Sequence, residues 1–254
     1  MNDHDYPILE FDPSPEAMIE PRRLIAPIDI APHCVLCFFQ DVIDGLRADG
    51  RLRVVHTLGS EMGPNPVYEL EVDGRRLVVV HPGVCAPLAA GFTDELIALG
   101  CRAFIACGGA GVLDQRLVVG HVVVPDAAVR DEGTSYHYLP PAREVAPSPA
   151  ALAAIEATLQ RHDVPYVVGK TWTTDGFYRE TAARVARRRA EGCLTVEMEA
   201  AAFFAVGRFR GVPIGQILYS GDDLSGEVWD GRAWRRQPIR ERLFWLAAEA
   251  CLQL

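Results

Sequence analysis

Strand-like and helix-like segments alternate along the chain from residue 52 to its end, and this alternation restricts the possible folds more than any other feature. The apolar run "PYVVGKTWTT" (165–174) indicates a strand, and "ETAARVARRRAEG" (180–192), which follows it, has helical periodicity. This order is typical of α/β proteins, in which helices cover both faces of a mostly parallel or mixed sheet. We predict strands at 52–59, 102–109, 117–125, 165–174, 194–199 and 212–221, a hairpin over 67–83 that turns at Asp73-Gly74, and helices at 86–100, 148–163, 180–192, 200–211 and 239–254.

Residues 1–33 differ from the rest of the chain because they are rich in proline and acidic side chains. Closely spaced prolines prevent a long helix, so this segment is predicted to be an N-terminal arm packed on the body. Residues 34–254 contain no linker rich in glycine and serine and no repeat, and we predict that they form a single domain.

The charge balance argues against nucleic acid as a partner. The chain has a net charge of -9 and no basic stripe, whereas binding to a phosphate backbone requires a positive surface. The densest basic cluster, residues 184–192, has the spacing of the solvated side of a helix. No apolar run approaches the roughly 20 residues of a membrane span, and the acidic start "MNDHDYPILEFD" is unlike a signal peptide. We therefore expect no membrane partner and a cytoplasmic location.

The seven cysteines lie mostly in apolar contexts, which favours reduced thiols in a core over disulfides. Only Cys34 and Cys37 have the CxxC spacing, and no second CxxC or histidine pair is present to complete a tetrahedral zinc site. We interpret them as half-buried thiols beside an apolar strand or helix, and we predict neither a metal nor an organic cofactor.

Chemically versatile residues follow four of the predicted strands. In α/β sheets, ligands bind beyond the carboxyl ends of strands, where loops converge. That rule selects "CGGAG" (107–111), "TTDGFY" (173–178), "VEME" (196–199) and "SGDD" (220–223). Together these segments combine glycine backbone, aromatic rings and carboxylates, so we expect them to form one site.

Each of the four segments has a functional and a structural interpretation. "CGGAG" is either an anion site made of backbone N–H groups or only a tight turn, and the ring pair Phe177 and Tyr178 either stacks on a heterocycle or belongs to the core. Glu197 and Glu199 point the same way if both lie on a strand, and a carboxylate there suits two vicinal hydroxyls; the alternative is a helix start. Asp222 and Asp223 either include a proton donor or cap a helix or turn.

The segment "TVEMEAAAFFAVGRFRGVPIGQILYSGDD" (195–223) resembles the signature region of the nucleoside phosphorylases of the purine and uridine phosphorylase superfamily. The order of the other elements is similar to that family along roughly residues 50–250. The resemblance implies an α/β, three-layer sandwich around a mixed, barrel-like central sheet, and a homo-oligomer such as a dimer, trimer or hexamer. It also implies a small-molecule nucleoside and inorganic phosphate as co-substrates.

The resemblance further implies a role for each matching residue. It implies that Glu199 and Met198 bind ribose, that Glu197 and Asp222 are catalytic, that Phe177, Tyr178 and Asp222 bind the base with Asp222 protonating purine N7, and that Gly108, Gly109 and Gly111 bind phosphate. Because the sugar becomes cationic in the transition state, a nearby negative charge and a proton for the departing base both lower the barrier.

The chain departs from the family's pattern where phosphate is bound. Ala106 stands in place of an arginine, Gly109 in place of a serine or threonine, and "LIAPIDIAP" (24–32) in place of a glycine-aspartate-proline turn. Other cations that could serve are Arg22, Arg23 and Arg130, and the glutamine and arginine that read uracil are absent after "FY". We expect a purine-preferring nucleoside phosphorylase; the alternatives are a hydrolytic nucleosidase of the same fold and a nucleoside-binding protein without turnover.

Overall fold

The structure is a computed structural model that describes residues 6–233 and 238–254. Its strands are β1 (His33–Cys37), β2 (Arg53–Ser60), β3 (Gly63–Val72), β4 (Arg75–Val80), β5 (Ala103–Val112), β6 (Val122–Asp131), β7 (Glu144–Val145), β8 (Tyr166–Thr174), β9 (Cys193–Glu197) and β10 (Ile214–Asp223). Its helices are α1 (Pro21–Leu24), α2 (Gln40–Ala48), α3 (Ala86–Leu99), α4 (Pro149–Arg161), α5 (Ala182–Ala190), α6 (Ala200–Arg210) and α7 (Ile239–Cys251), with the 3-10 turns η1 (Pro7–Leu9), η2 (Thr134–His137) and η3 (Phe177–Arg179).

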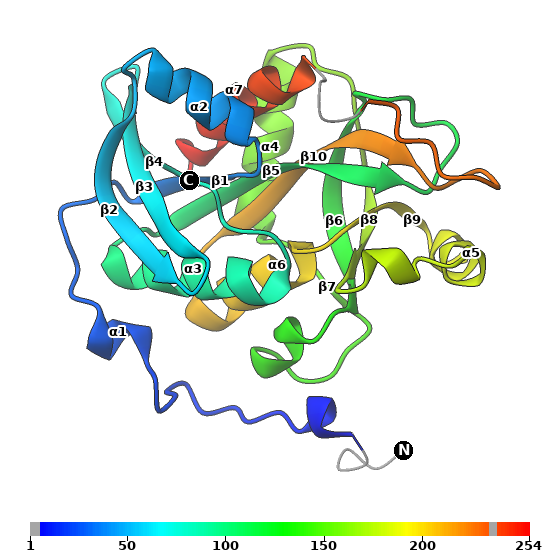
Figure 1. Ribbon diagram of the computed structural model, residues 1–254, viewed down its shortest axis with the longest axis horizontal. Helices are drawn as coiled ribbons and strands as arrows, with labels where there is room; N and C mark the ends of the chain where they lie inside the picture. The colour runs from blue at the N-terminus through cyan, green and yellow to red at the C-terminus, as the bar shows by residue number, and fades with distance from the viewer. Residues whose placement is uncertain (1–5, 234–237) are drawn as a thin grey trace.

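One sheet of mixed direction runs through the molecule in the order β10-β6-β8-β9-β5-β1-β4-β3-β2 (Figure 1). β10 also pairs with β5, so β5, β10, β6, β8 and β9 close into a ring. β5 runs parallel to β10 and antiparallel to β9, whereas β6, β8 and β9 run parallel to one another. The predicted α/β sandwich with a barrel-like mixed sheet is confirmed.

Helices cover both faces of this sheet (Figure 1). Successive residues of β1 alternate between two cores: Cys34 packs with residues of α3 and α6, and Val35 with residues of α2, α4 and α7. A strand that is buried on both faces is apolar throughout, which explains the run "CVLC". Cys34 and Cys37 are therefore fully buried, not half-buried as predicted, and all seven cysteines are free thiols.

Local signals in the sequence set several element boundaries. The hairpin between β3 and β4 turns at Asp73 and Gly74, whose φ angles of 49° and 73° are those of the turn that suits paired strands. Pro149 begins α4, and α3 ends at Gly100 with φ of 138°. The predicted strand 117–125 was wrong in its first half, because β6 begins only at Val122, after a turn in which Gly120 has φ of 88°.

The basic cluster 184–192 is not simply a solvated helix face. Arg188 is buried, and its guanidinium pairs with Asp131 at 2.8 Å and with Glu191 at 3.0 Å. Arg184 also pairs with Asp131, and the two arginines lie against the ring of Trp172. These contacts hold α5 on the sheet.

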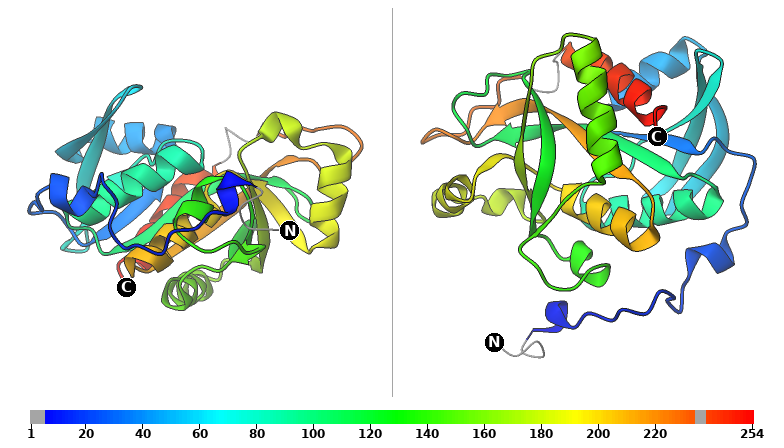
Figure 2. Two further views of the ribbon diagram at one scale, coloured as in Figure 1. Left: turned by 90° about the horizontal axis from the view of Figure 1, so that it is seen from below. Right: turned by 180° about the vertical axis from the view of Figure 1, so that it is seen from behind.

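Residues 6–32 run along the outside of the layer formed by α3 and α6 (Figures 1 and 2). The buried carboxylate of Glu20 accepts hydrogen bonds from Arg210 of α6, which also pairs with Asp94 of α3. Tyr138 donates a further hydrogen bond to Asp94 at 2.8 Å. The boundary between an arm over 1–33 and a domain over 34–254 stays a prediction.

No helix within residues 6–233 and 238–254 is long and apolar enough to cross a membrane. Nor do those residues contain three or more His, Cys, Asp or Glu side chains grouped so that they could hold a metal ion.

Candidate active site

The glycines of "CGGAG" lie in a strand, so the predicted glycine turn was wrong. β5 continues to Val112, and none of Gly108, Gly109 and Gly111 has a positive φ. Added side chains would be tightly packed: a Cβ on Gly108 would lie 3.2 Å from the ring of Phe38, and one on Gly111 2.6 Å from Leu224. Close packing against neighbouring side chains therefore favours glycine here.

The same stretch of β5 lies opposite a gap in the sheet. β1 pairs with β5 as far as Cys107, and β9 begins to pair with the same edge only at Gly111. Between these points residues 108–110 pair with β10 alone among the strands that the structure describes. Some backbone N–H groups of a parallel strand face each edge, so this gap exposes backbone donors next to the ends of β8 and β9.

Glu197 is the last residue of β9 and fixes the start of α6. Its carboxylate accepts hydrogen bonds from Thr173 Oγ1 at 2.6 Å and from the backbone N–H groups of Glu199 and Ala200 at 2.7 and 2.6 Å. These backbone groups are among the donors that a helix start leaves unpaired. Glu197 thus caps α6 and also lines the candidate site.

Glu199 does not lie on a strand. We expected the side chains of Glu197 and Glu199 to point the same way only if both residues were on a strand, and this condition is not met. Glu199 is the N-cap residue of α6, and its Oε1 accepts a hydrogen bond from the N–H of Cys85 at 2.7 Å. Cys85 has a φ of 74°, which is uncommon for a residue other than glycine. Burial raises the pKa of Glu199 to about 8, and the charge of Glu197 adds to the effect. Met198, between the two, is half-buried.

Two further carboxylates lie beside this pair: Asp175, which is in the selected segment 173–178 but was given no role, and Glu132, which the sequence analysis missed. Glu132 is buried just after β6 and accepts a hydrogen bond from the N–H of Ser135, and Asp175 accepts one from Gly133 at 2.8 Å. Burial, with a smaller contribution from the charge of Glu132, raises the pKa of Glu197 to about 7. The rule that ligands bind at strand ends selected the segment with Asp175, and applied to the end of β6 it would also have found Glu132.

The predicted aromatic pair lies on the surface. Phe177 and Tyr178 form the turn η3 after β8; their side chains are 50% and 88% exposed, and their ring centroids are 4.1 Å apart. They are therefore not part of the core, which was the structural alternative for these rings. Glu180, directly after the turn, was not predicted; burial and the charge of Asp222 raise its pKa to about 7.

Asp222 and Asp223, the last two residues of β10, have different surroundings. Asp222 accepts a hydrogen bond on Oδ2 from the indole N–H of Trp229 at 2.7 Å, and its Oδ1 lies 3.7 Å from where a Cβ on Gly111 would be. Asp223 pairs with Arg232 and accepts hydrogen bonds from Ser225. Asp223 therefore fixes the following loop, while Asp222 lies over the glycine strand.

The cations named as phosphate ligands have other contacts. Arg130 is buried in β6 and donates hydrogen bonds to Ser135 Oγ and to the carbonyl oxygens of Leu139 and Pro140. Arg22 and Arg23 lie on α1 in the arm, where Arg23 pairs with Glu16.

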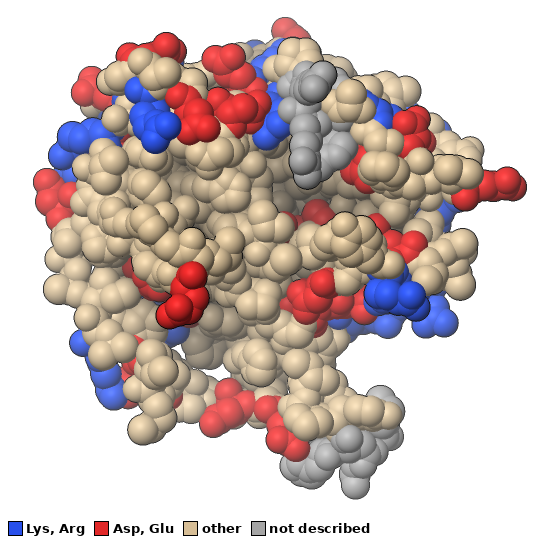
Figure 3. All heavy atoms as spheres, in the orientation of Figure 1, with Lys and Arg blue, Asp and Glu red and all other residues tan. Residues whose placement is uncertain are grey.

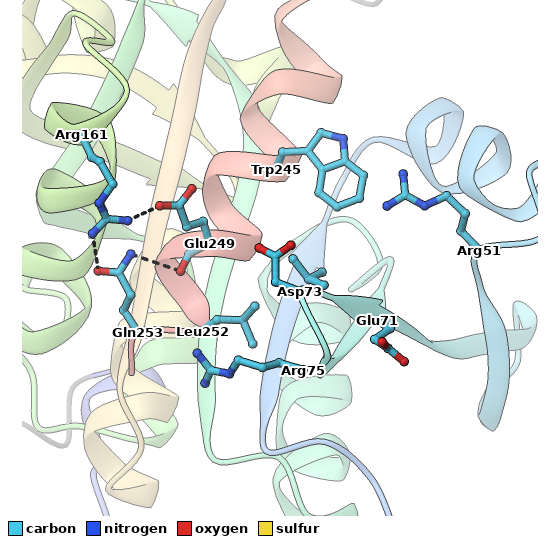
Figure 4. Close-up of a pocket in the computed structure, with 10 residues that line it drawn as sticks. Arg51, Glu71, Asp73, Arg75, Arg161, Trp245, Glu249, Leu252 and Gln253 are labelled. Atoms are coloured by element: carbon cyan, nitrogen blue, oxygen red, sulfur yellow. Dashed lines mark hydrogen bonds and ion pairs between the residues drawn. The ribbon is translucent and has the colours of Figure 1, made fainter.

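Two cavities help to delimit the site. A cavity of about 740 Å³ lies between the hairpin of β3 and β4 and the end of α7 (Figure 4). Arg161 there is paired with Glu249, Arg51 stacks on Trp245, and none of the predicted site residues lines it. A second cavity, of about 630 Å³, lies under residues 12–21 and reaches Asp175. Figure 3 shows a hollow near the middle of the face seen in Figure 1, with carboxylate atoms inside and beside it.

Comparison with known sequences identifies related proteins. A family model described as the phosphorylase superfamily matches residues 32–238. A guanosine phosphorylase from Halorubrum lacusprofundi is 33% identical over 151 residues, covering 59% of this chain and 63% of that protein. A uridine phosphorylase from Treponema pallidum is 31% identical over 151 residues, covering 55% and 58%. The chain thus spans less than two thirds of the length of these curated relatives.

Comparison with solved structures gives the same fold. An AMP nucleosidase from Bacteroides thetaiotaomicron matches with a TM-score of 0.71 and 25% identity over 87% of both chains. A uridine phosphorylase from Vibrio fischeri matches with a TM-score of 0.76 and 23% identity, over 92% of this chain and 98% of that one.

Proposed function

Since the chain belongs to the phosphorylase superfamily, we propose that it cleaves the N-ribosidic bond of nucleosides, with purine nucleosides preferred and inorganic phosphate as co-substrate. The products are the free base and pentose 1-phosphate. One observation carries the proposal: two buried carboxylates, Glu197 and Glu199, lie where β9 meets α6, beside the unpaired edge of β5 and the end of β10.

In the proposed mechanism, Glu199 accepts hydrogen bonds from the two ribose hydroxyls and Met198 packs on the sugar. Glu197 accepts a hydrogen bond from the backbone N–H of Glu199, so it orients that residue, and in its ionised form, above about pH 7, it adds negative charge near the sugar. A sugar that becomes cationic in the transition state is stabilised by fixed negative charge in an enclosed site. The interaction is stronger in the transition state than with neutral substrate, so it accelerates the reaction.

The base leaves between the aromatic pair and Asp222. A phosphate oxygen forms the new bond to C1′, the bond from C1′ to N9 breaks, and its electron pair goes to the purine. Asp222 gives its proton to N7, so the base leaves as a neutral molecule, and phosphate or water later returns a proton to the carboxylate. The indole N–H of Trp229 donates its hydrogen bond to Oδ2 of Asp222. We therefore assign Oδ1 of Asp222 as the oxygen that faces N7.

For phosphate we propose the gap beside residues 108–110, with Gly108, Gly109 and Gly111 presenting backbone to the anion. The unpaired edge of β5 supports this assignment, since backbone N–H groups bind anions without a charged side chain. No organic cofactor or metal has a role in the proposed mechanism.

The second candidate is hydrolysis by the same site, with water in place of phosphate. Ala106 is fully buried and Gly109 lies against the ring of Tyr219, so neither position supplies an anion-binding side chain. The resemblance to an AMP nucleosidase also supports a hydrolytic alternative. The third candidate is a protein that binds nucleosides without turnover.

Incubation with a panel of purine and pyrimidine nucleosides, with and without inorganic phosphate, separates the three. Base release that requires phosphate and yields pentose 1-phosphate supports phosphorolysis. Release without phosphate, yielding free pentose, identifies a hydrolase. Saturable binding without release identifies a binding protein.

We further propose that the enzyme acts in purine salvage in the cytoplasm as a homo-oligomer, without nucleic acid or membrane partners. The free thiols of its cysteines and the oligomers known for its family support this setting. Light scattering on the purified protein measures the oligomeric state.

A further inference from the structure

Glu180 is a carboxylate beside the proposed base subsite that the mechanism above does not use. It directly follows the turn formed by Phe177 and Tyr178, and its N–H donates to the carbonyl oxygen of Phe177 at 3.4 Å. The side chain is half-buried, yet it makes no hydrogen bond or ion pair with residues 6–233 or 238–254. A carboxylate in this position has lost part of its hydration without gaining a protein partner.

The charged groups that face Glu180 leave it without a counterion. Asp222 at the end of β10 contributes a like charge, and Arg184 in α5 an opposite one. Arg184, however, directs Nη2 to Asp131 at 2.5 Å and Nη1 to the carbonyl oxygen of Arg179. The balance of burial, the repulsion from Asp222 and the weaker attraction of Arg184 raises the pKa of Glu180 to about 7. Both protonation states are therefore populated near neutral pH.

We propose that Glu180 is a specificity-determining residue of the base subsite and contacts the substituent at purine C6. The inference rests on the proposed function, in which Asp222 faces N7. C6 carries the substituent next to N7, so a carboxylate close to Asp222 on the same side of the base meets that substituent first. The aromatic pair proposed to stack on the base lies in the turn that ends at Glu180.

The two protonation states of Glu180 select opposite substituents. An ionised carboxylate only accepts hydrogen bonds, so it pairs with a 6-amino group and repels a 6-oxo oxygen. A protonated carboxyl donates, so it pairs with a 6-oxo oxygen. The enzyme should therefore change its preference from 6-oxo to 6-amino purine nucleosides as the pH rises.

The experiment compares kcat/KM for adenosine and for inosine, which differ at C6, between about pH 6 and about pH 8. The ratio of adenosine to inosine should rise about tenfold across this range, the effect of gaining one charged hydrogen bond and losing one repulsion. Using the ratio cancels any effect of pH that is common to the two substrates. In Glu180→Gln the ratio should be independent of pH, because an amide both donates and accepts and does not titrate. Glu241→Gln, at an exposed position on α7, should keep the wild-type slope.

The outcomes separate the inference from the function on which it rests. Two outcomes would overturn the role of Glu180 while leaving the proposed function standing. In the first, nucleosides are cleaved but the ratio of kcat/KM for adenosine to that for inosine does not change with pH. In the second, this ratio changes with pH equally in the wild type and in Glu180→Gln. If no nucleoside is cleaved, calorimetric titration with free adenine and hypoxanthine at both pH values decides. Tighter adenine binding at the higher pH, lost in Glu180→Gln, supports the inference without the reaction; absence of binding or of any pH effect overturns it.

Discussion

The two ends of the proposed nucleoside site differ in how firmly the protein fixes them. At the sugar end, Glu197 and Glu199 are buried and hydrogen-bonded to the backbone at a junction of strand and helix. At the base end, Tyr178 is 88% exposed, and the carboxylate of Glu180 makes no hydrogen bond or ion pair with the described residues. A group held by the scaffold is costly to change, whereas a loop tolerates substitution. We therefore expect the sugar chemistry to be the constant part of this site and base selection the adjustable part.

The largest expected effect tests the chemistry at the base end. Asp222→Asn keeps a hydrogen-bonding amide but cannot give up a proton. It should slow the cleavage of inosine by roughly a hundred- to ten-thousand-fold, the contribution typical of a general acid. A nucleoside methylated at N7, whose base already leaves readily, should be cleaved at nearly the wild-type rate. Steady-state kinetics on both substrates provide the measurement.

The matched control for this comparison is Asp126→Asn, at an exposed position in β6. Asp223→Asn is a poor control, because Asp223 anchors the next loop through Arg232 and Ser225. Equal losses on both substrates would mean that Asp222 positions the loop, and the expected preference for purines would then lose its main support.

At the sugar end, Glu199→Gln should reduce kcat about a hundredfold or more while leaving the fold intact. The amide fills the same space but carries no negative charge toward the sugar, so the difference is measured above about pH 8, where the wild-type carboxyl is ionised. Circular dichroism checks the fold, and Glu241→Gln is the surface control. Unchanged kinetics would return Glu199 to a purely structural role at the start of α6.

The enclosed sugar end also predicts a pH dependence of stability. The carboxyl groups of Glu197 and Glu199 have pKa values of about 7 and about 8 in the folded protein, against 4.5 for an ordinary glutamate. Above pH 4.5 the unfolded chain releases these protons while the folded protein keeps them, so the free energy of unfolding should fall from there to about pH 8. Since one pKa unit corresponds to about 1.4 kcal/mol, we expect the pair to lose several kcal/mol.

Urea unfolding at a series of pH values measures this loss, and Glu199→Gln should flatten the curve. The variant should then be more stable than the wild type near pH 8, although it is less active. Parallel curves for the two proteins would show that Glu199 is already ionised in the folded state, and that the site is less enclosed than the structure indicates.

The smallest effect is expected for Tyr178→Ala. Loss of one stacking ring should raise KM for purine nucleosides about three- to tenfold and leave kcat nearly unchanged. The melting temperature should not move, because the ring is largely exposed. A clear fall in melting temperature would instead assign Tyr178 to a packing role, and the contrast between the two ends would weaken.

The fold was largely predictable because local patterns agree with its tertiary packing. The hairpin turn at Asp73 and Gly74 and the start of α4 at Pro149 depend on backbone conformations that their residue types favour. The sequence failed where packing overrides such signals. The glycines of β5 suggest a turn, but they are needed under Phe38, Tyr219 and Leu224, which come from distant parts of the chain.

The site was predictable in part for the same reason. Motif spacing selected Glu197, Glu199 and Asp222, but it did not reveal that Glu197 caps α6 or that Glu199 leaves the strand. Glu180 was missed because nothing local distinguishes it from a surface acid, and Glu132 was missed because the strand-end rule was not applied to β6. Their environment comes from strands that meet only when the sheet closes into a ring.

Helix α6 connects the sugar end to the arm. Its first turn carries Glu199 and Ala200, and its last carries Arg210, which holds Glu20 of the arm. Eleven residues of helix form a stiff rod about 16 Å long. A displacement of the arm, transmitted through Arg210, would move α6 as a rigid body. Glu199 at the start of α6 would then move with the helix, without a series of small side-chain adjustments. We therefore expect changes at Glu20 of the arm to alter the position of Glu199.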